Sequence, residues 1–215
     1  ALTKAAELEA PLRRAVKEIL RHQHDDRRDE RRFGGWGYYG DQLRRQDNWP
    51  RASITAWQVM ALESARLAGL QVPDVAFADA KTFLLGCLDQ RRGAFRYSHD
   101  PSRLNGAYAI LPGSTPASLF ALSLLEADLE TPHFERAWQF LAERAPEDYS
   151  YAGDDAFVYE AHGNLYFWYY ASLASMRRGG STWKRWNANL QETLLPSQRA
   201  DGSWKPISTY ARNYA

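Results

Sequence analysis

Four residues with acid–base side chains lie close together in the chain: Asp154, Asp155, Glu160 and His162. Tyrosine and tryptophan residues flank them on both sides. Carboxylates beside aromatic rings can act as general acids, while the ring faces stabilise positive charge or stack on sugars. This cluster is therefore the candidate catalytic site. In the competing interpretation, Asp154 and Asp155 cap the following helix and complement its dipole. Helix capping is a commoner role for aspartate than catalysis.

The single cysteine, Cys87, excludes an internal disulfide framework and a metal site built from several thiolates. It lies in the apolar run from Phe83 to Leu88, where we expect a buried structural thiol. The five histidines show no spacing typical of metal ligands. We therefore expect neither a bound metal nor a cofactor.

An apolar periodicity close to that of an α-helix recurs along most of the chain and predicts a series of helices. Their expected ranges are 2–22, 54–68, 73–88, 114–125, 131–141, 159–177 and 181–195. We expect Ser53 and Ser181 to cap two of these helices. No stretch alternates at period two, so strands should be few or absent. The expected fold class is all-α.

Three of the expected helices end near a glutamine, and each glutamine precedes a loop that contains glycine and an aromatic residue. These loops run from Gln23 to Trp36, from Gln90 to Phe95 and from Gln198 to Trp204. The glutamine can bond free carbonyls at a helix end or loop amides of its neighbour, the glycine allows a close backbone approach, and the ring can pack over the helix terminus. One hairpin cannot bury its apolar face alone, so a repeat of roughly 50–70 residues predicts stacked helical hairpins.

The segment from Leu194 to Trp204 is similar to the QW motif, Q-x-x-x-G-x-W, of squalene-hopene and oxidosqualene cyclases. Gln198, Gly202 and Trp204 occupy its defining positions. The stretches QRRGAF and GGWGYYG resemble looser versions, which are also seen in protein prenyltransferase β subunits. Segments 53–73 and 166–190 look most like bacterial proteins described as prenyltransferase/squalene-oxidase-repeat or terpene-cyclase-like, many without an assigned activity.

This resemblance implies an α/α toroid, in which inner helices line a central cavity and outer helices surround them. It implies a single repeat domain over residues 1–215, with a ring that is incomplete at the C-terminus. We expect further hairpins or another chain, such as a second copy, to complete the ring. The implied ligand is an apolar molecule of the isoprenoid type. The side chains expected to line the cavity are Trp57, Met60, Phe120, Tyr166 and Tyr169.

The catalytic motifs of the resembled enzymes are not matched. Triterpene cyclases protonate an alkene with an aspartate in D-x-D-D-T-A, whereas the comparable stretch from Arg51 to Ala56 keeps Thr and Ala without an acid. Prenyltransferases place zinc on a D-x-C pair, and here Cys87 precedes Asp89 in the reverse order. The resemblance therefore predicts a fold without predicting a reaction.

A third motif, Asp25-Asp26-x-x-Asp29, has the spacing with which class I isoprenoid synthases hold magnesium and diphosphate. In those enzymes the carboxylates share one helical turn that faces a cavity. Here the motif leaves a helix end and enters arginine-rich sequence before Gly34, which predicts a solvated polar loop.

Two functions of other classes compete with binding of an apolar ligand. A carbohydrate-active or carbohydrate-binding toroid would place Trp36, Tyr38, Tyr39 and Trp49 along a shallow groove. A non-catalytic repeat scaffold would dock another protein. A deep apolar cavity favours the first function, a groove with two facing carboxylates the second, and an exposed aromatic patch without a pocket the third.

Charge and hydropathy limit the partners. The net charge of +1 gives no reason to expect nucleic acid, and no apolar stretch is long enough to span a bilayer. The first residues lack the apolar centre of a secretory signal, so we take the cytoplasm as the default compartment.

Overall fold

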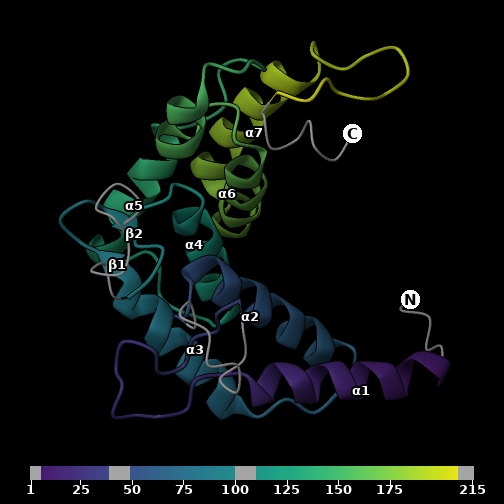
Figure 1. Ribbon diagram of the computed structural model, residues 1–215. Helices are drawn as coiled ribbons and strands as arrows, with labels where there is room; N and C mark the ends of the chain where they lie inside the picture. The colour runs from purple at the N-terminus through teal and green to yellow at the C-terminus, as the bar shows by residue number, and fades with distance from the viewer. Residues whose placement is uncertain (1–5, 39–48, 100–109, 208–215) are drawn as a thin grey trace. The chain divides into compact units, whose positions relative to one another are not determined.

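The computed structural model describes residues 6–38, 49–99 and 110–207, and these are predominantly helical (Figure 1). The all-α prediction is therefore confirmed. The α-helices are α1 (Ala6–Arg21), α2 (Ala52–Leu67), α3 (Asp74–Cys87), α4 (Ser114–Leu124), α5 (Pro132–Ala142), α6 (Leu165–Arg178) and α7 (Gly180–Leu194). A π-helix, η3 (Ala156–Glu160), precedes α6, and a two-stranded sheet pairs β1 (Leu88–Asp89) with β2 (Ala94–Phe95).

The chain forms two compact units, each assembled from segments that are separate in the sequence. Unit 1 comprises Ala1–Leu88, Arg96–Ala109 and Ala121–Ala127. Unit 2 comprises Asp89–Phe95, Ile110–Phe120 and Asp128–Ala215. The single repeat domain that the sequence suggests stays a prediction.

In unit 1, α2 packs against both α1 and α3 (Figure 1). The apolar stripe of α3 explains this packing, because Phe77, Ala80, Leu84 and Cys87 recur at helical spacing and all are buried. Burial also confirms the prediction for the Cys87 thiol and raises its pKa to about 12. This thiol is therefore a poor nucleophile in the folded protein.

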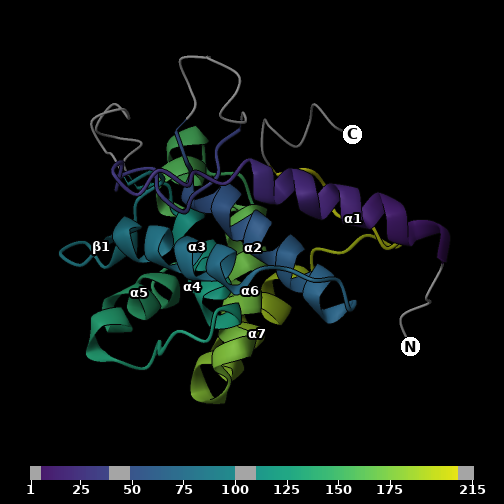
Figure 2. The ribbon, with the colours of Figure 1, turned by 90° about the horizontal axis from the view of Figure 1, so that it is seen from below.

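In unit 2, α6 packs against α7 (Figure 2). The ring of Phe167, which is fully buried in α6, lies with its centroid 6.4 Å from that of Phe140 and 6.2 Å from that of Trp186. Such tilted ring pairs add to the burial of apolar area and join α5, α6 and α7 into one core.

The three glutamine–glycine–aromatic loops are named here the first (23–36), second (90–95) and third (198–204) turns. In the first turn the Gln23 side-chain amide donates to the Gly34 carbonyl at 3.0 Å, and the Trp36 indole donates to the Ile19 carbonyl at 2.7 Å. In the third turn the Gln198 amide donates to the Gly202 carbonyl at 2.8 Å, and the Trp204 indole donates to the Leu194 carbonyl at 2.9 Å.

The first and third turns therefore share one register. In each, the bonded glycine lies two residues before the tryptophan, and the indole reaches the carbonyl of the residue four positions before the glutamine. Gly34 and Gly202 also share a left-handed backbone, with φ of 82° and 84°. The glutamines do not bond the helix-end carbonyls that the sequence suggests, because their amides donate to the glycine carbonyls of the turns, and the carbonyls near the ends of α1 and α7 accept from the indoles instead.

The second turn differs in its side-chain contacts. The Gln90 amide lies 2.8 Å from His133 Nε2, and Phe95 has no indole N–H to donate. Its glycine keeps the same place, since Gly93 lies two residues before Phe95 with φ of 63°. The backbone N–H of Phe95 donates to Thr115 Oγ1 at 3.0 Å, as that of Trp36 donates to Thr55 Oγ1 at 3.0 Å in the first turn.

Several predicted helix starts are wrong. Ser53 lies inside α2, which begins at Ala52 after an Arg51 N-cap without a side-chain bond. The sixth helix begins at Leu165 instead of residue 159, because the Asn164 side chain accepts from the Phe167 N–H and caps it. Ser181 lies one residue inside α7, whose N-cap is Gly179.

Candidate functional site

The candidate catalytic residues lie in unit 2, on the segment that connects α5 to α6. Asp154 and Asp155 are exposed just before η3, and the Tyr151 hydroxyl donates to Asp154 Oδ1. The η3 helix ends at Glu160, and the next residue, Ala161, has a left-handed φ of 65°. The competing prediction, that these aspartates cap α6, is wrong, because η3 separates them from its first residue and Asn164 supplies the cap.

Glu160 and His162 line a pocket of about 340 Å³ in the same segment. Asp154 and Asp155 do not line it. Its lining residues are Glu143, Arg144, Ala145, Pro146, Glu147, Asp148, Glu160, Ala161, His162 and Trp168. The structure thus brings together two of the four predicted residues and adds charged groups from the end of α5 and the loop after it.

Asp148 and His162, which line this pocket, contact each other and Ser150, which is not a lining residue. His162 Nε2 lies 3.0 Å from Asp148 Oδ1 and 3.2 Å from Ser150 Oγ, and Ser150 Oγ donates to Asp148 Oδ2 at 2.8 Å. A nucleophilic triad needs the carboxylate on one ring nitrogen and the hydroxyl on the other. Here both partners reach the same nitrogen, so the arrangement holds the loop together and does not activate Ser150.

The Arg144 side chain is the cation of this pocket. Burial lowers its pKa, and the carboxylates of Glu143 and Glu160 raise it in part. Its guanidinium stacks on Phe140, with Cζ 3.8 Å from the ring centroid, and Nη1 donates to the Phe140 carbonyl at 3.3 Å. The pocket therefore joins several carboxylates to one stacked arginine, without an activated nucleophile.

Sequence reasoning missed Asp148, Ser150 and Arg144. The short spacing between Asp148 and Ser150 is common in loops and carries no signal. Their approach to His162 depends on the close passage of Gly163, where a side chain's Cβ would meet the Ser150 carbonyl oxygen at 2.6 Å. That contact joins residues far apart in the loop and could not be read from local pattern.

The residues predicted to bind an apolar ligand fall in both units. In unit 1, Trp57 is 46% exposed on α2, and Met60 beside it is half-buried. In unit 2, Tyr169 is 56% exposed on α6, Tyr166 is half-buried, and Phe120 is buried in α4.

The aromatic residues of the predicted sugar groove are mostly unavailable to a ligand. Trp36 is only 2% exposed because it packs over the end of α1, and Trp49 is buried under the Arg32 guanidinium, with Cζ 4.3 Å from its ring centroid. Tyr38 is exposed, and its hydroxyl lies 2.8 Å from that of Tyr97. Tyr39 lies outside the described residues.

The exposed tyrosine of α6 belongs to an aromatic cluster. The ring centroids of Tyr166 and Tyr170 are 4.7 Å apart, and those of Tyr169 and Tyr170 are 5.0 Å apart. Tyr169 shares one face of the helix with Leu165 and Met176, which are also exposed. We name these three side chains the α6 apolar face.

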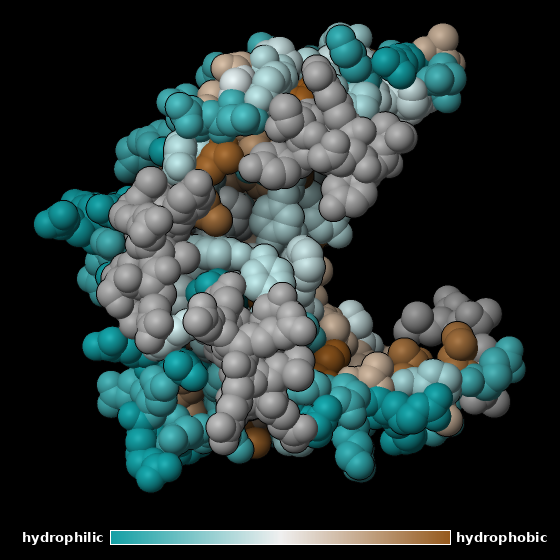
Figure 3. Space-filling view, viewed as in Figure 1, coloured by the Kyte–Doolittle hydropathy of each residue, from teal (hydrophilic) through white to brown (hydrophobic). Residues whose placement is uncertain are grey.

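Unit 1 exposes apolar side chains on α2 and α1. On α2, Trp57, Ala61 and Ser64 follow one another at helical spacing and are exposed. We name Trp57, Met60 and Ala61 the α2 apolar face. On α1, Leu8 and Leu12 are exposed, and Figure 3 shows apolar side chains among polar ones along this helix.

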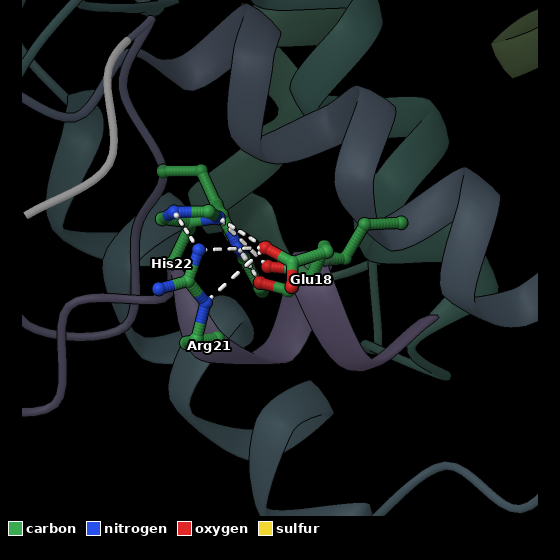
Figure 4. Close-up of polar contacts among 5 residues, drawn as sticks. Glu18, Arg21 and His22 are labelled. Carbon is green, nitrogen blue, oxygen red and sulfur yellow. Dashed lines mark hydrogen bonds and ion pairs between the residues drawn. The ribbon is translucent and has the colours of Figure 1, made fainter. Parts of the chain in front are cut away.

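Glu18, Arg21 and His22 form a polar cluster at the C-terminal end of α1 (Figure 4). Arg21 donates to Glu18 Oε2 from Nε at 3.1 Å and from Nη2 at 2.7 Å, and its hydrogen bond lowers the pKa of Glu18. His22 Nε2 lies 3.3 Å from Arg21 Nη2, which can only donate, so this nitrogen accepts. His22 Nδ1, 2.8 Å from the Glu18 carbonyl oxygen, therefore carries the proton.

The aspartate motif after α1 is a polar loop, as the sequence predicts. The Asp26 carboxylate in this loop accepts hydrogen bonds from the Arg28 side chain and backbone. The side-chain hydrogen bond from Arg28 is the main cause that lowers the pKa of Asp26. In the described ranges, no group of three or more His, Cys, Asp or Glu residues could hold a metal ion. Within those ranges, too, no helix is both long enough and apolar enough to cross a membrane.

No family model, no curated protein and no solved structure matches this chain.

Proposed function

We propose that the chain is a segment of an α/α toroid of the terpene-cyclase and prenyltransferase-repeat type, and that it binds an apolar ligand of the isoprenoid class. The observation that carries this proposal is the exposure of large aromatic side chains on two helices, Trp57 on α2 and Tyr169 on α6. We make no proposal of turnover.

The two apolar faces support binding of an apolar molecule. When a tryptophan and a tyrosine stay exposed to water, the protein loses the free energy that their burial would provide, about 25 cal/mol for each Å² of apolar surface. Contiguous exposed apolar side chains often mark a binding surface for this reason. On α6 the exposed ring is also braced by Tyr170, 5.0 Å away, so a ligand would meet a pre-ordered surface.

The toroid part of the proposal is supported by the repeated turns. A toroid repeats one hairpin, so corresponding turns should make the same bonds. The first and third turns do so, with glutamine-to-glycine bonds of 3.0 and 2.8 Å and indole-to-carbonyl bonds of 2.7 and 2.9 Å. In this arrangement α2, α4 and α6 are inner helices, and α1, α3, α5 and α7 are outer helices.

The acid–base residues give no support for a reaction. Cyclisation of an alkene needs a strong acid in an apolar cavity. Asp154 and Asp155 are exposed, and Glu160 and His162 line a pocket rich in charged side chains.

Native mass spectrometry of the purified protein tests the proposal. We expect a co-purifying apolar molecule that leaves on denaturation, and we expect added farnesol to give an adduct. Trp57→Gln and Tyr169→Gln should each lower the bound fraction, because each removes an exposed ring from the apolar face to which it belongs.

Leu195→Gln is the matched control, because Leu195 is exposed just beyond α7 and belongs to neither apolar face. It should bind farnesol like the unaltered protein. The proposal fails if the unaltered protein binds neither a native ligand nor farnesol, or if Leu195→Gln lowers binding as much as the other two variants.

A further inference from the structure

A second pocket in unit 2, of about 280 Å³, lies against α5, α6 and α7. Its lining residues are Glu135, Trp138, Gln139, Leu141, Ala142, Ala145, Ser175, Arg178, Ser181, Thr182, Arg185, Trp186 and Asn189. None of the predicted catalytic or ligand-binding residues lines it. We propose that this pocket binds a small hydroxyl-rich molecule that carries one anionic group, such as a sugar phosphate.

The α7 side of the pocket supplies hydrogen-bond donors. Ser181, Thr182, Arg185 and Asn189 lie on one helical face and all line the pocket. Arg185 is exposed, so its guanidinium can turn toward a bound anion. Arginine binds phosphate and carboxylate through paired charge-assisted hydrogen bonds, so this side suits the anionic group.

The α5 side supplies acceptors. Gln139 donates its amide N–H to Glu143 Oε1 at 2.8 Å, and its carbonyl oxygen is an acceptor that this bond does not use. Glu135, one helical turn earlier, adds a carboxylate, one oxygen of which lies 3.8 Å from Arg178 Nη2. Acceptors of this kind bind hydroxyl groups and would repel a second anionic group, so the two sides of the pocket select different parts of one ligand.

Arg178, at the end of α6, is held in one orientation at this pocket. Its Nε and Nη2 donate to the two carboxylate oxygens of Glu130, both at 3.0 Å, and its Cζ lies 4.6 Å from the Trp138 ring centroid. A fixed guanidinium loses little conformational entropy when a ligand binds.

Two buried tryptophans form an apolar floor. The indole of Trp138 donates to the Leu129 carbonyl at 3.0 Å, and that of Trp186 donates to Ser172 Oγ at 2.9 Å. Both polar N–H groups are therefore satisfied inside the protein, and the rings present only carbon to the pocket. An apolar floor with polar groups at its edges is the usual composition of a small-molecule site.

Isothermal titration calorimetry tests this proposal with glucose 6-phosphate, glucose and inorganic phosphate as probes. We expect glucose 6-phosphate to bind with a Kd of about 10–100 µM and each half alone to bind at least about tenfold more weakly. Arg185→Gln should weaken binding of glucose 6-phosphate about tenfold, because it removes the exposed cation of the pocket. Lys184→Gln, next to it on α7 and outside the pocket lining, should leave binding unchanged.

Three results would overturn the proposal. Glucose 6-phosphate could fail to saturate the protein at millimolar concentration. Inorganic phosphate could bind as tightly as glucose 6-phosphate, which would show that the α5 side contributes nothing. Arg185→Gln could bind glucose 6-phosphate as tightly as the unaltered protein does, or no more weakly than Lys184→Gln does. Farnesol binding involves other residues, so failure of this test leaves the proposed apolar site untouched, and the reverse also holds.

Discussion

The first and third turns make the same side-chain hydrogen bonds, yet their tryptophans differ in burial. Trp36 is 2% exposed, whereas Trp204 is 37% exposed. In the first turn the Gln23 side-chain amide also donates to the Ala76 carbonyl of α3 at 2.9 Å. The backbone N–H of Trp36 donates to Thr55 Oγ1 of α2. The comparison separates two causes. The local sequence determines the bonds inside a turn, while neighbouring helices determine how deeply its tryptophan is buried.

The largest difference should appear when the equivalent glycines are replaced. Both have left-handed φ angles, which cost an alanine roughly 1–2 kcal/mol. A Cβ on Gly34 would also lie 2.0 Å from the Asp79 carbonyl oxygen in α3, whereas one on Gly202 would meet only Gln198 Nε2 at 3.9 Å. We expect Gly34→Ala to lower the free energy of unfolding by more than about 3 kcal/mol and Gly202→Ala by about 1 kcal/mol, measured by urea denaturation.

Cys87 reports which unit opens in these variants. Its buried thiol, with a pKa of about 12, should react with a disulfide reagent about 10³-fold more slowly than a free cysteine near neutral pH. Gly34→Ala should make Cys87 reactive at a lower urea concentration, because both residues lie in unit 1. Equal losses of stability in the two variants, or an unchanged Cys87 reactivity in Gly34→Ala, would contradict the idea that packing against α3 distinguishes the turns.

A smaller effect should follow when the threonines beneath the first and second turns are changed. Thr55 and Thr115 are fully buried, and each accepts a backbone N–H at 3.0 Å. Valine keeps the shape and removes the acceptor, so each Thr→Val variant should lose about 1–3 kcal/mol, the cost of an unpaired buried N–H. Chemical denaturation measures the loss, and Thr→Ser, which keeps the hydroxyl, is the control. Valine variants as stable as serine variants would show that the hydroxyl does not hold the turn.

These turns also mark how far the sequence could predict the structure. The helices and the burial of Cys87 follow from periodicity and local chemistry, whereas the glycine carbonyls that accept from Gln23 and Gln198 were not predicted. The cap at Asn164 was missed because the aspartates nearby are equally good capping residues. The π-helix η3 separates these aspartates from α6 and leaves Asn164 as the residue that caps it.

The candidate site was predicted less completely than the fold. Glu160 and His162 do share a pocket, but Asp148 and Ser150 reach His162 beside a close backbone passage at Gly163 that leaves no periodic pattern. The pocket against α5, α6 and α7 gave no signal either, because its polar residues read as ordinary outward faces of helices until those helices are packed.

The smallest expected effect separates the carboxylates of the first and third turns. Hydrogen bonds lower the pKa of both, from the Arg28 side chain to Asp26 and from the Ser203 hydroxyl and N–H to Asp201. A depressed pKa in the folded state means that each contribution is present above the ordinary aspartate value of 3.8 and is lost as pH falls through the folded pKa. Salt screens a contact with a cation more than one with a neutral hydroxyl. In carboxyl NMR titrations, added salt should therefore raise the pKa of Asp26 and leave that of Asp201 nearly unchanged. The opposite order would mean that the charge of Arg199, a minor cause at Asp201, governs the third turn instead of Ser203.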